Sequence, residues 1–328
     1  MAEISSHLSF SQENLVTVAI NNTLTPTTIP QGSIHFHNDP TRYPAGYFTQ
    51  SYNFDFTNYA GIHRPVFLYT TPRIYIEDIL LTTAVDGTSA SLKIRGKGLD
   101  YPLVVKDFSL LKWLGANSFR TSHYPYAEEI MDMADQEGIM VVDECPAVGL
   151  SGFGEVLMNK HILVMRELVR RDKNRPSVIM WSVGNEPQSN QEAAANYFRS
   201  VVKATHEDDP TRPVTCVLNR GPIEFAVGDP DPAFTWSEEY QVELMLQNFE
   251  AFDKLRSQGF FVGEMIWNFA DFATPQGSKR VAGNKKGVFT RNRQPKTAAH
   301  VLRWRYHSLA GTTQQLGNRT ALWRHIFS

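Results

Sequence analysis

The sequence predicts two parts, a short β-rich part followed by a larger α/β part built on a parallel sheet. Residues 15–71 contain short β-prone runs separated by clusters of Thr, Pro, Gly and Asn, without helical periodicity. After Gly98, helical patterns with apolar residues at i, i+3 and i+4 alternate with short continuous apolar runs. Such alternation is typical of parallel strands covered by helices.

The β-rich part is expected to be antiparallel. The runs LVTVAI, GYFTQSYNFDF and PVFLYTT indicate strands of a sandwich or of a jelly roll. Two further runs, IYIEDILLTTAV and ASLKI, follow Pro72 and are separated by the turn residues Asp86 and Gly87. These two runs are too short to form a domain of their own.

The α/β part is predicted to contain helices and strands in alternation. The expected helices cover residues 101–115, 127–138, 159–171, 191–205, 242–259 and 296–309. The expected strands cover residues 118–124, 139–144, 177–186, 214–218 and 260–269. Both a doubly wound sheet and a (β/α)8 barrel fit this order, but no glycine-rich dinucleotide or phosphate fingerprint follows any strand, which favours the barrel.

Composition excludes several classes of function. The chain has 32 Lys and Arg against 34 Asp and Glu, so no basic surface for nucleic acid is expected. No apolar run is long enough to span a membrane, and the first residues lack the pattern of a signal peptide, so the chain as written is expected to enter the cytosol. Cys145 and Cys216 lack ligand spacing, which predicts buried free thiols and no metal site or disulfide.

Polar residues gather where the expected strands end. The pairs at these ends are Arg120 and His123, Asp143 and Glu144, Asn185 and Glu186, and Trp267 and Asn268. Barrel enzymes assemble their active sites at this face, from the loops that follow several strands. The pattern therefore predicts a site to which four strands contribute.

Glu186 is the strongest catalytic candidate. It closely follows the apolar run 178–183, and a carboxylate at the mouth of an apolar barrel is expected to be desolvated, which favours the protonated form that a general acid needs. Its neighbour Asn185 could donate to a substrate hydroxyl. The alternative is that Asn185, Glu186 and Pro187 cap the helix that begins near Gln188.

The other strand-end residues suit sugar recognition. Arg120 offers a planar donor fork and His123 a switchable polar group, although either could be a structural residue. Trp267 offers a flat apolar face on which a sugar ring could stack, although aromatic residues more often serve the core. One of Asp143 and Glu144 is expected to tether Arg120 or to position its neighbours, which is support rather than chemistry.

A basic loop, RVAGNKKG, follows the last expected strand. Its Arg280, Asn284, Lys285 and Lys286 could hold a carboxylate through charge-assisted hydrogen bonds. The alternative is a solvated basic loop, but the place of this loop beside the other strand-end residues favours binding.

Several motifs resemble one known family. DKNRPSVIMWSVGNE resembles the acid/base signature of glycoside hydrolase family 2, and GANSFRTSHYPY resembles its other signature. VGEMIWNFADF and GNKKGVFTRNRQPK are similar to segments of the β-glucuronidase members, whose Asn-x-Lys element binds the glucuronate carboxylate. Here that element would be Asn284 and Lys286. VAINNTLTPTTIPQG, YNFDF, NYAG and LYTTP are similar to the family's amino-terminal jelly roll.

This resemblance implies a fold and an activity. It divides the chain into a partial sugar-binding (galactose-binding-like) jelly roll at 1–72, a remnant of an immunoglobulin-like sandwich at 73–93 and an incomplete (β/α)8 TIM barrel at 94–328. Glu186 would be the proton donor of a retaining β-D-glucuronoside hydrolase that needs no cofactor and no metal. The sugar site would be lined by Arg120, His123, Asn185, Trp267 and Arg280.

The resemblance also implies partners. The substrates would be glycosaminoglycan ends or glucuronide conjugates, with no nucleic acid and no membrane partner. Animal relatives act in lysosomes and assemble as homo-oligomers, so the family pattern allows a homo-oligomer while the compartment of this chain stays open.

The chain departs from the family pattern at the catalytic nucleophile. Retaining glycosidases use two carboxylates about 5–5.5 Å apart. The segment that carries the second, expected between 214–218 and 260–269, has no counterpart here. Glu238 and Glu239 resemble a stretch beyond that segment, and Glu264 resembles a structural acid.

The barrel itself is also incomplete. Residues 88–98 replace its first strand, and five strands stand where a closed barrel needs eight. The sequence therefore predicts impaired hydrolysis, in which another carboxylate or water alone completes the displacement. The alternatives are a non-catalytic glucuronide-binding or interaction protein and a relic that does not fold.

Overall fold

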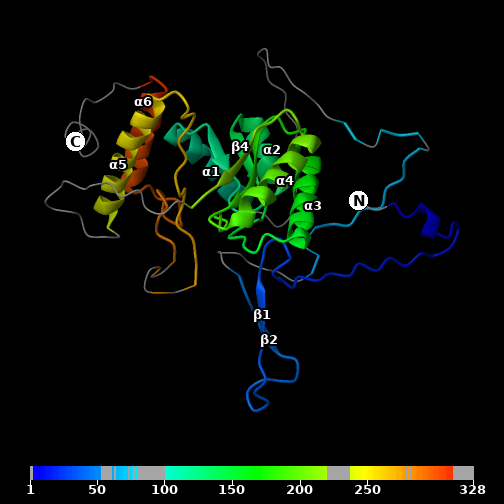
Figure 1. Ribbon diagram of the computed structural model, residues 1–328. Helices are drawn as coiled ribbons and strands as arrows, with labels where there is room; N and C mark the ends of the chain where they lie inside the picture. The colour runs from blue at the N-terminus through cyan, green and yellow to red at the C-terminus, as the bar shows by residue number, and fades with distance from the viewer. Residues whose placement is uncertain are drawn as a thin grey trace.

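Figure 1 shows the computed structural model of the chain. The structure describes residues 3–52, 61–62, 64–72, 74–76, 78–79, 100–219, 237–275, 277, 280 and 283–312. Most of the predicted sandwich remnant at 73–93, and all of the segment 88–98 that was expected to replace the first barrel strand, lie outside these residues. The statements that follow concern the described residues.

A parallel sheet lies at the centre of the α/β part. Its strands are β3 (Ser118–Arg120), β4 (Met140–Glu144), β5 (Val178–Asn185) and β6 (Val214–Val217), hydrogen-bonded in that order. Each neighbouring pair is parallel, which confirms four of the predicted strands and their direction. Because all four run the same way, the residues that end them lie at one edge of the sheet.

The predicted helices are confirmed. They are α1 (Tyr101–Leu114), α2 (Glu128–Glu137), α3 (Glu155–Asp172), α4 (Glu192–Asp208), α5 (Glu238–Arg256) and α6 (Thr297–Leu309), and a short 3-10 turn, η1, covers Ser5–His7. In Figure 1, α3 and α4 lie side by side near the sheet, and α5 and α6 pair on the opposite side of the molecule, where α6 contacts α1. Helices α2, α3 and α4 connect the successive strands, as parallel pairing requires.

Local sequence sets both ends of the helix before β3. Asp100 accepts a hydrogen bond from the Leu103 N–H at 3.2 Å and so caps the first turn of α1. The helix ends at Gly115, whose φ of 78° is a left-handed conformation that glycine adopts without steric cost. Ser237 caps α5 in the same way, by accepting from the Tyr240 N–H at 3.1 Å. The capping residues therefore agree with the pattern of the apolar runs.

Apolar burial forms two clusters. The first lies between the sheet and helices α2, α3 and α4, and it includes the fully buried Val141, Trp181 and Val183. The second joins α1, α5 and α6, and it includes the fully buried Phe289. Both clusters contain residues from segments far apart in the chain. Burial of apolar area is therefore what holds the helices to the rest of the α/β part.

The fifth predicted strand, at 260–269, is wrong. These residues adopt no strand, and beside them occur only isolated bridges, between Ala270 and Phe289 and between Phe272 and Asn284. A parallel strand needs a neighbour that supplies ladder hydrogen bonds, and in the described residues the sheet ends at β3 and β6. An apolar pattern without such a neighbour does not produce a strand.

The β-rich part contains one hairpin in the described residues. Its strands, β1 (Ser33–Phe36) and β2 (Phe48–Ser51), are antiparallel, and the hairpin projects away from the central sheet in Figure 1. The runs 15–20 and 65–71 are exposed and adopt no strand, so these two strand predictions are wrong. Neither run has a described strand beside it that could pair with its backbone. The jelly roll and the division into domains remain predictions.

Membrane insertion was not expected from the sequence. Among the helices of the described residues, none combines the length and the apolar character that a membrane span requires.

We expect Phe289→Ala to destabilise the protein by about 3–5 kcal/mol, because it removes a fully buried phenyl ring and leaves a cavity. Phe10→Ala is the matched control, because Phe10 is 81% exposed. Its truncation should change the free energy of unfolding by less than about 0.5 kcal/mol. Urea unfolding followed by circular dichroism measures both values, and equal effects of the two changes would contradict the second apolar cluster.

Candidate active site

Three neighbouring strands bring polar side chains together at their carboxyl ends. Arg120 ends β3, Glu144 ends β4 and Asn185 ends β5. The Nη1 of Arg120 donates to Glu144 Oε2 at 2.8 Å and to Asn185 Oδ1 at 3.1 Å. Residues distant in the chain are thus joined at one edge of the sheet, as the strand-end pattern predicted.

Glu144 lies at the centre of these contacts. Its carboxylate is fully buried and accepts hydrogen bonds from Arg120 and from the Ser182 hydroxyl at 2.7 Å, and His123 Nδ1 lies 3.4 Å from its Oε1. A buried carboxylate requires such partners, because an unpaired buried charge is costly. The sequence left open whether Asp143 or Glu144 tethers Arg120, and the structure assigns this role to Glu144.

Trp267 completes the group, although its segment is not a strand. Its ring stacks on His123 with centroids 4.8 Å apart and planes 25° apart, and Arg120 Cζ lies 5.9 Å from the ring centroid. Trp267 remains 40% exposed, so part of this residue is accessible to a ligand. We call Arg120, His123, Glu144, Asn185 and Trp267 the strand-end cluster.

A cavity of about 710 Å³ adjoins this cluster. One wall is formed by α1 and β3 and the other by the segment 264–272, with Arg120, His123 and Trp267 among the lining residues. This volume falls within the range of about 300–1,000 Å³ that is typical of small-molecule sites. The strand-end cluster therefore borders a space that can hold a sugar-sized ligand.

Glu186 directly follows β5, as predicted, but its surroundings differ from the prediction. Its side chain is exposed, so the expected desolvation is wrong. Its N–H donates to the Val217 carbonyl at 2.7 Å, and its φ of 49° lies in the left-handed region that non-glycine residues rarely adopt. The alternative of a helix cap is also wrong, because α4 begins later, at Glu192, with Gln191 at its N-cap position.

The predicted carboxylate-binding loop is attached to the Trp267 segment by backbone hydrogen bonds. The Asn268 N–H donates to the Lys286 carbonyl at 3.4 Å, and the Asn284 N–H donates to the Phe272 carbonyl at 2.8 Å. Arg280 and Lys286 are exposed, and both can face an anionic ligand. The loop therefore lies next to the strand-end cluster, and its cations are accessible.

Asn284 has a more specific position than the sequence suggested. It is only 4% exposed, and its Oδ1 accepts from the Lys286 N–H at 3.0 Å. This local turn, in which an Asn side chain mimics a backbone carbonyl, orients Lys286. The Asn284 side-chain nitrogen is the group that could then contact a ligand carboxylate.

A buried ion pair supports the loop from behind. Asp271 Oδ1 accepts from Lys296 Nζ at 2.8 Å and from the Gly287 N–H at 3.0 Å. A Cβ at Gly287 would lie 2.2 Å from the Asp271 nitrogen, so only glycine fits this close approach. Lys296 Nζ also donates to the Lys285 carbonyl at 2.9 Å.

The carboxylates that line the cavity are ion-paired with arginine in the described part of the chain. Glu264 accepts from Arg305 at 2.6 Å and from Arg256 at 2.7 Å, which agrees with its predicted structural role. Asp107 accepts from Arg293 at 2.7 and 2.8 Å. Each of these two carboxylates therefore already has an arginine counter-charge.

The cysteines are free thiols. Cys145 is fully buried, as predicted, whereas Cys216 is only partly buried. Burial raises the pKa of Cys145 far above its usual range and raises the pKa of Cys216 to about 12, so both thiols stay neutral. Within the described residues, no group of three or more His, Cys, Asp or Glu side chains could hold a metal ion.

Two residues of the site were missed in the sequence. Ser182 donates to Glu144, and Thr121 accepts from the Glu144 N–H at 2.8 Å. Ser182 could have been found as the one polar side chain inside the apolar run of β5. Thr121 follows Arg120 directly and carries no comparable signal.

Comparison with known proteins identifies the family. Residues 89–227 and 226–310 match the family described as glycosyl hydrolases family 2, TIM barrel domain. The chain therefore belongs to glycoside hydrolase family 2, and its parallel sheet is part of that family's α/β barrel.

Its relatives within the family are β-glucuronidases. The chain is 36% identical to the β-glucuronidases of Pongo abelii and Homo sapiens, over 91% of its own length and 72% of theirs. Each alignment runs over 468 positions but takes up 91% of 328 residues, so about 170 positions have no residue of this chain. The expected internal deletions agree with these gaps.

Solved structures give the same relationship. A β-D-glucuronidase from Dictyoglomus thermophilum superposes with a TM-score of 0.74 at 33% identity, covering 93% of this chain and 81% of that one. A Ruminococcus gnavus β-glucuronidase in complex with D-glucaro 1,5-lactone gives a TM-score of 0.56 at 38% identity, covering 64% of this chain and 47% of that one. The chain is thus a β-glucuronidase-like glycoside hydrolase.

Glu144→Gln should destabilise the protein by about 3–5 kcal/mol, because it removes one partner of a buried ion pair and leaves the Arg120 guanidinium without its counter-charge. Glu137→Gln is the matched control. Glu137 pairs with Lys112 at the surface, and loss of such a pair costs about 0–1 kcal/mol. Chemical unfolding measures both changes, and equal costs would contradict the central place of Glu144.

Proposed function

We propose that this chain binds β-D-glucuronosides at the strand-end cluster and hydrolyses them slowly, with Glu186 as the proton donor. The observation that carries the proposal is the hydrogen-bonded group of Arg120, Glu144 and Asn185, in which Asn185 directly precedes the exposed Glu186 in the chain. The relatives named β-glucuronidase support the choice of substrate.

The cluster offers distinct contacts to each part of the sugar. The exposed face of Trp267 suits stacking of the pyranose ring, and Arg120 and His123 lie against that same ring. The Asn185 amide can bind a ring hydroxyl. The glucuronate carboxylate would bind Arg280, Lys286 and the Asn284 amide through charge-assisted hydrogen bonds.

Glu186 would protonate the glycosidic oxygen while the bond from that oxygen to the anomeric carbon breaks. General acid catalysis of this kind contributes about 10²–10⁴-fold. A retaining mechanism also needs an attacking carboxylate about 5–5.5 Å from the donor, and the cavity-lining carboxylates in the described part of the chain are bound by arginines. Water would then be the attacking group, and turnover would be slow.

A non-catalytic glucuronide-binding protein is the second candidate. The exposure of Glu186 favours it, because the prediction of a general acid relied on a carboxylate that is removed from water. Under this alternative the strand-end cluster and the basic loop bind the sugar but do not cleave it.

The proposal extends to the domains and to assembly. We infer that residues 1–72 correspond to the sugar-binding jelly roll of the family, residues 73–93 to a remnant of its sandwich and residues 94–328 to its barrel. The 93% coverage of this chain in the match to the Dictyoglomus thermophilum structure supports this division. A homo-oligomer is the corresponding expectation for the assembly.

Glu186→Gln should abolish release of the chromophore from an aryl β-D-glucuronide, because glutamine cannot donate the proton. Glu192→Gln, which alters an exposed carboxylate at the start of α4, is the matched control and should leave turnover unchanged. Absence of turnover in the unmodified protein, together with retained binding of D-glucaro 1,5-lactone, would favour the binding protein over the enzyme.

Lys286→Ala should weaken binding of an aryl β-D-thioglucuronide by about 10–100-fold, which corresponds to the loss of one hydrogen bond to a charged group. Lys285→Ala is the control, because the contact that Lys285 makes to Lys296 uses its backbone carbonyl. Calorimetry measures both affinities. An aryl thioglucoside, which lacks the carboxylate, should bind both variants equally, and a loss of affinity for it would contradict the role of Lys286.

A further inference from the structure

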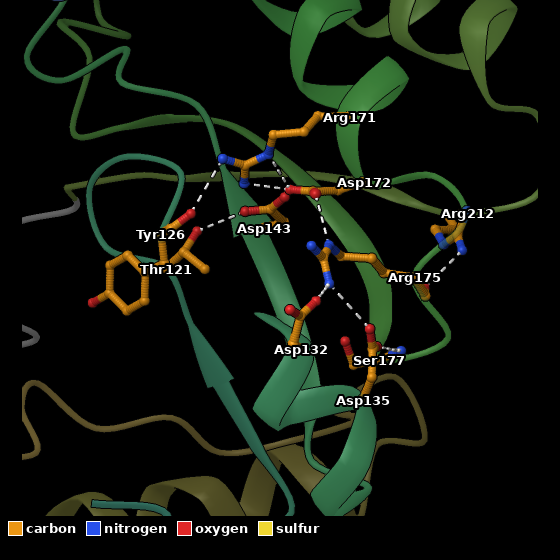
Figure 2. Close-up of polar contacts among 10 residues, drawn as sticks. All are labelled: Thr121, Tyr126, Asp132, Asp135, Asp143, Arg171, Asp172, Arg175, Ser177 and Arg212. Carbon is orange, nitrogen blue, oxygen red and sulfur yellow. Dashed lines mark hydrogen bonds and ion pairs between the residues drawn. The ribbon is translucent and has the colours of Figure 1, made fainter. Parts of the chain in front are cut away.

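A second polar network lies behind the strand-end cluster, on the helix side of β4. Side chains alternate along a strand, so Asp143 points away from the side on which Glu144 holds Arg120. Figure 2 shows Asp143 beside Asp172, the last residue of α3. Both carboxyl groups are fully buried.

Two arginines bind Asp172. Its Oδ2 accepts from Arg171 Nε at 2.9 Å and from Nη2 of the same guanidinium, and its Oδ1 accepts from Arg175 Nε at 2.9 Å. Arg175 also reaches α2, where it contacts Asp132 at 2.7 Å and Asp135 at 3.2 Å. The negative charge of Asp172 is therefore compensated from two sides (Figure 2).

Asp143 has a different environment. Its Oδ1 accepts from the Thr121 hydroxyl at 2.9 Å, and within the described part of the chain its Oδ2 is buried without a donor. Burial, followed by the hydrogen bond to Asp172 and the charge of Asp172, raises the pKa of Asp143 to about 8, against the opposite effects of Thr121 and Arg171. This pKa favours the protonated form of Asp143 near neutral pH, and in that form its Oδ2 hydroxyl can donate to the neighbouring Asp172.

Thr121 connects this acid to the strand-end cluster. Its hydroxyl donates to Asp143 and accepts from the Glu144 N–H at 2.8 Å, and its own N–H continues the sheet by donating to the Val142 carbonyl at 3.1 Å. Thr121 also directly follows Arg120 in the chain. The Thr121 hydroxyl thus joins the carboxyl ends of β3 and β4. Asp143 is the acceptor that fixes the direction of its O–H bond.

We propose that Asp143 is a positioning residue for the sugar site. As a neutral acid bonded to Asp172 and Thr121, it fixes the ends of β3 and β4 so that Glu144 can hold Arg120 and His123. The proposal rests on the proposed function only where it assigns the sugar site to the strand-end cluster. Asp143 itself does not touch the substrate.

This role has a consequence for pH dependence. The folded state retains the Asp143 proton that the unfolded chain releases near pH 4, so the stabilisation from this group is complete below that pH and is lost as pH rises through about 8. Ionisation of Asp143 then places a second buried negative charge against Asp172. The charged groups Arg171 and Arg175 already bind Asp172, and Asp132 and Asp135 of α2 face Arg175.

The first test needs no ligand. The fluorescence contributed by Trp267, obtained by subtracting the spectrum of Trp267→Phe, reports the arrangement of Arg120 and His123 around its ring. We expect this signal to change with a midpoint near pH 8 in the unmodified protein and to stay constant in Asp143→Asn, whose amide can donate to Asp172 but cannot ionise. A midpoint that persists in Asp143→Asn overturns the proposal.

Asp143→Val, which has similar bulk but neither donor nor acceptor, completes the series. It should show the high-pH spectrum already at pH 7, so an unchanged Trp267 signal in this variant overturns the proposal. If the valine variant fails to fold, the comparison of the asparagine variant with the unmodified protein decides alone.

The second test uses an aryl β-D-thioglucuronide, which resists hydrolysis and stays ionised across this pH range. Its dissociation constant should rise about tenfold between pH 7 and pH 9 in the unmodified protein and less than about twofold in Asp143→Asn. Equal pH dependence in both proteins overturns the proposal. If the unmodified protein binds no thioglucuronide at any pH, the proposed function fails, while the fluorescence result still decides the role of Asp143.

Discussion

The ion pair between Glu144 and Arg120 is the interaction on which the site depends. A carboxylate that is fully removed from water is tolerated only with compensating charge and hydrogen bonds, and here the compensation comes from β3, from the loop that follows it and from β5. This requirement draws the ends of three strands toward one point. The same guanidinium then contacts Asn185 and lies over the Trp267 ring, so one buried charge organises the polar groups that a sugar would meet.

Two adjacent carboxyl groups of β4 have opposite electrostatic environments. Glu144 faces a guanidinium, and Asp143 faces another carboxylate together with one hydroxyl. The difference arises from the alternation of side chains along a strand, which sends one acid toward the site and the other toward the helices. Environment, more than residue type, decides what a carboxyl group can do in a protein interior.

Much of this arrangement could be predicted from the sequence, because it depends on local periodicity. The helices and the strands β3 to β6 follow from apolar spacing, and the clustering of Arg120 and Asn185 follows from the shared direction of parallel strands. The pairing of strands depends on segments that are distant in the chain. The apolar pattern at 260–269 therefore could not show that this segment has no neighbouring strand in the described sheet. The different roles of Asp143 and Glu144 could not be told apart from the sequence either, because the partners of these two acids come from α3, β3 and β5.

The exposure and orientation of individual side chains also could not be predicted from the sequence. Glu186 follows an apolar strand, yet its side chain is exposed, and no pattern near residue 186 reports this exposure. The side-chain direction of Asn284 was hidden for a similar reason, because its backbone pairs with Phe272 of another segment while its amide oxygen accepts from the Lys286 N–H. Sequence identified the residue types of the site, and tertiary packing set their orientation.

Trp267 belongs to a segment that is not paired into the sheet, whereas Arg120, Glu144 and Asn185 are carried by paired strands. The aromatic wall of the cavity and its polar floor therefore belong to separate backbone elements. Over generations, insertions or deletions near 260–275 could reshape the wall, and with it the range of accepted molecules, without refolding the scaffold that carries Glu186.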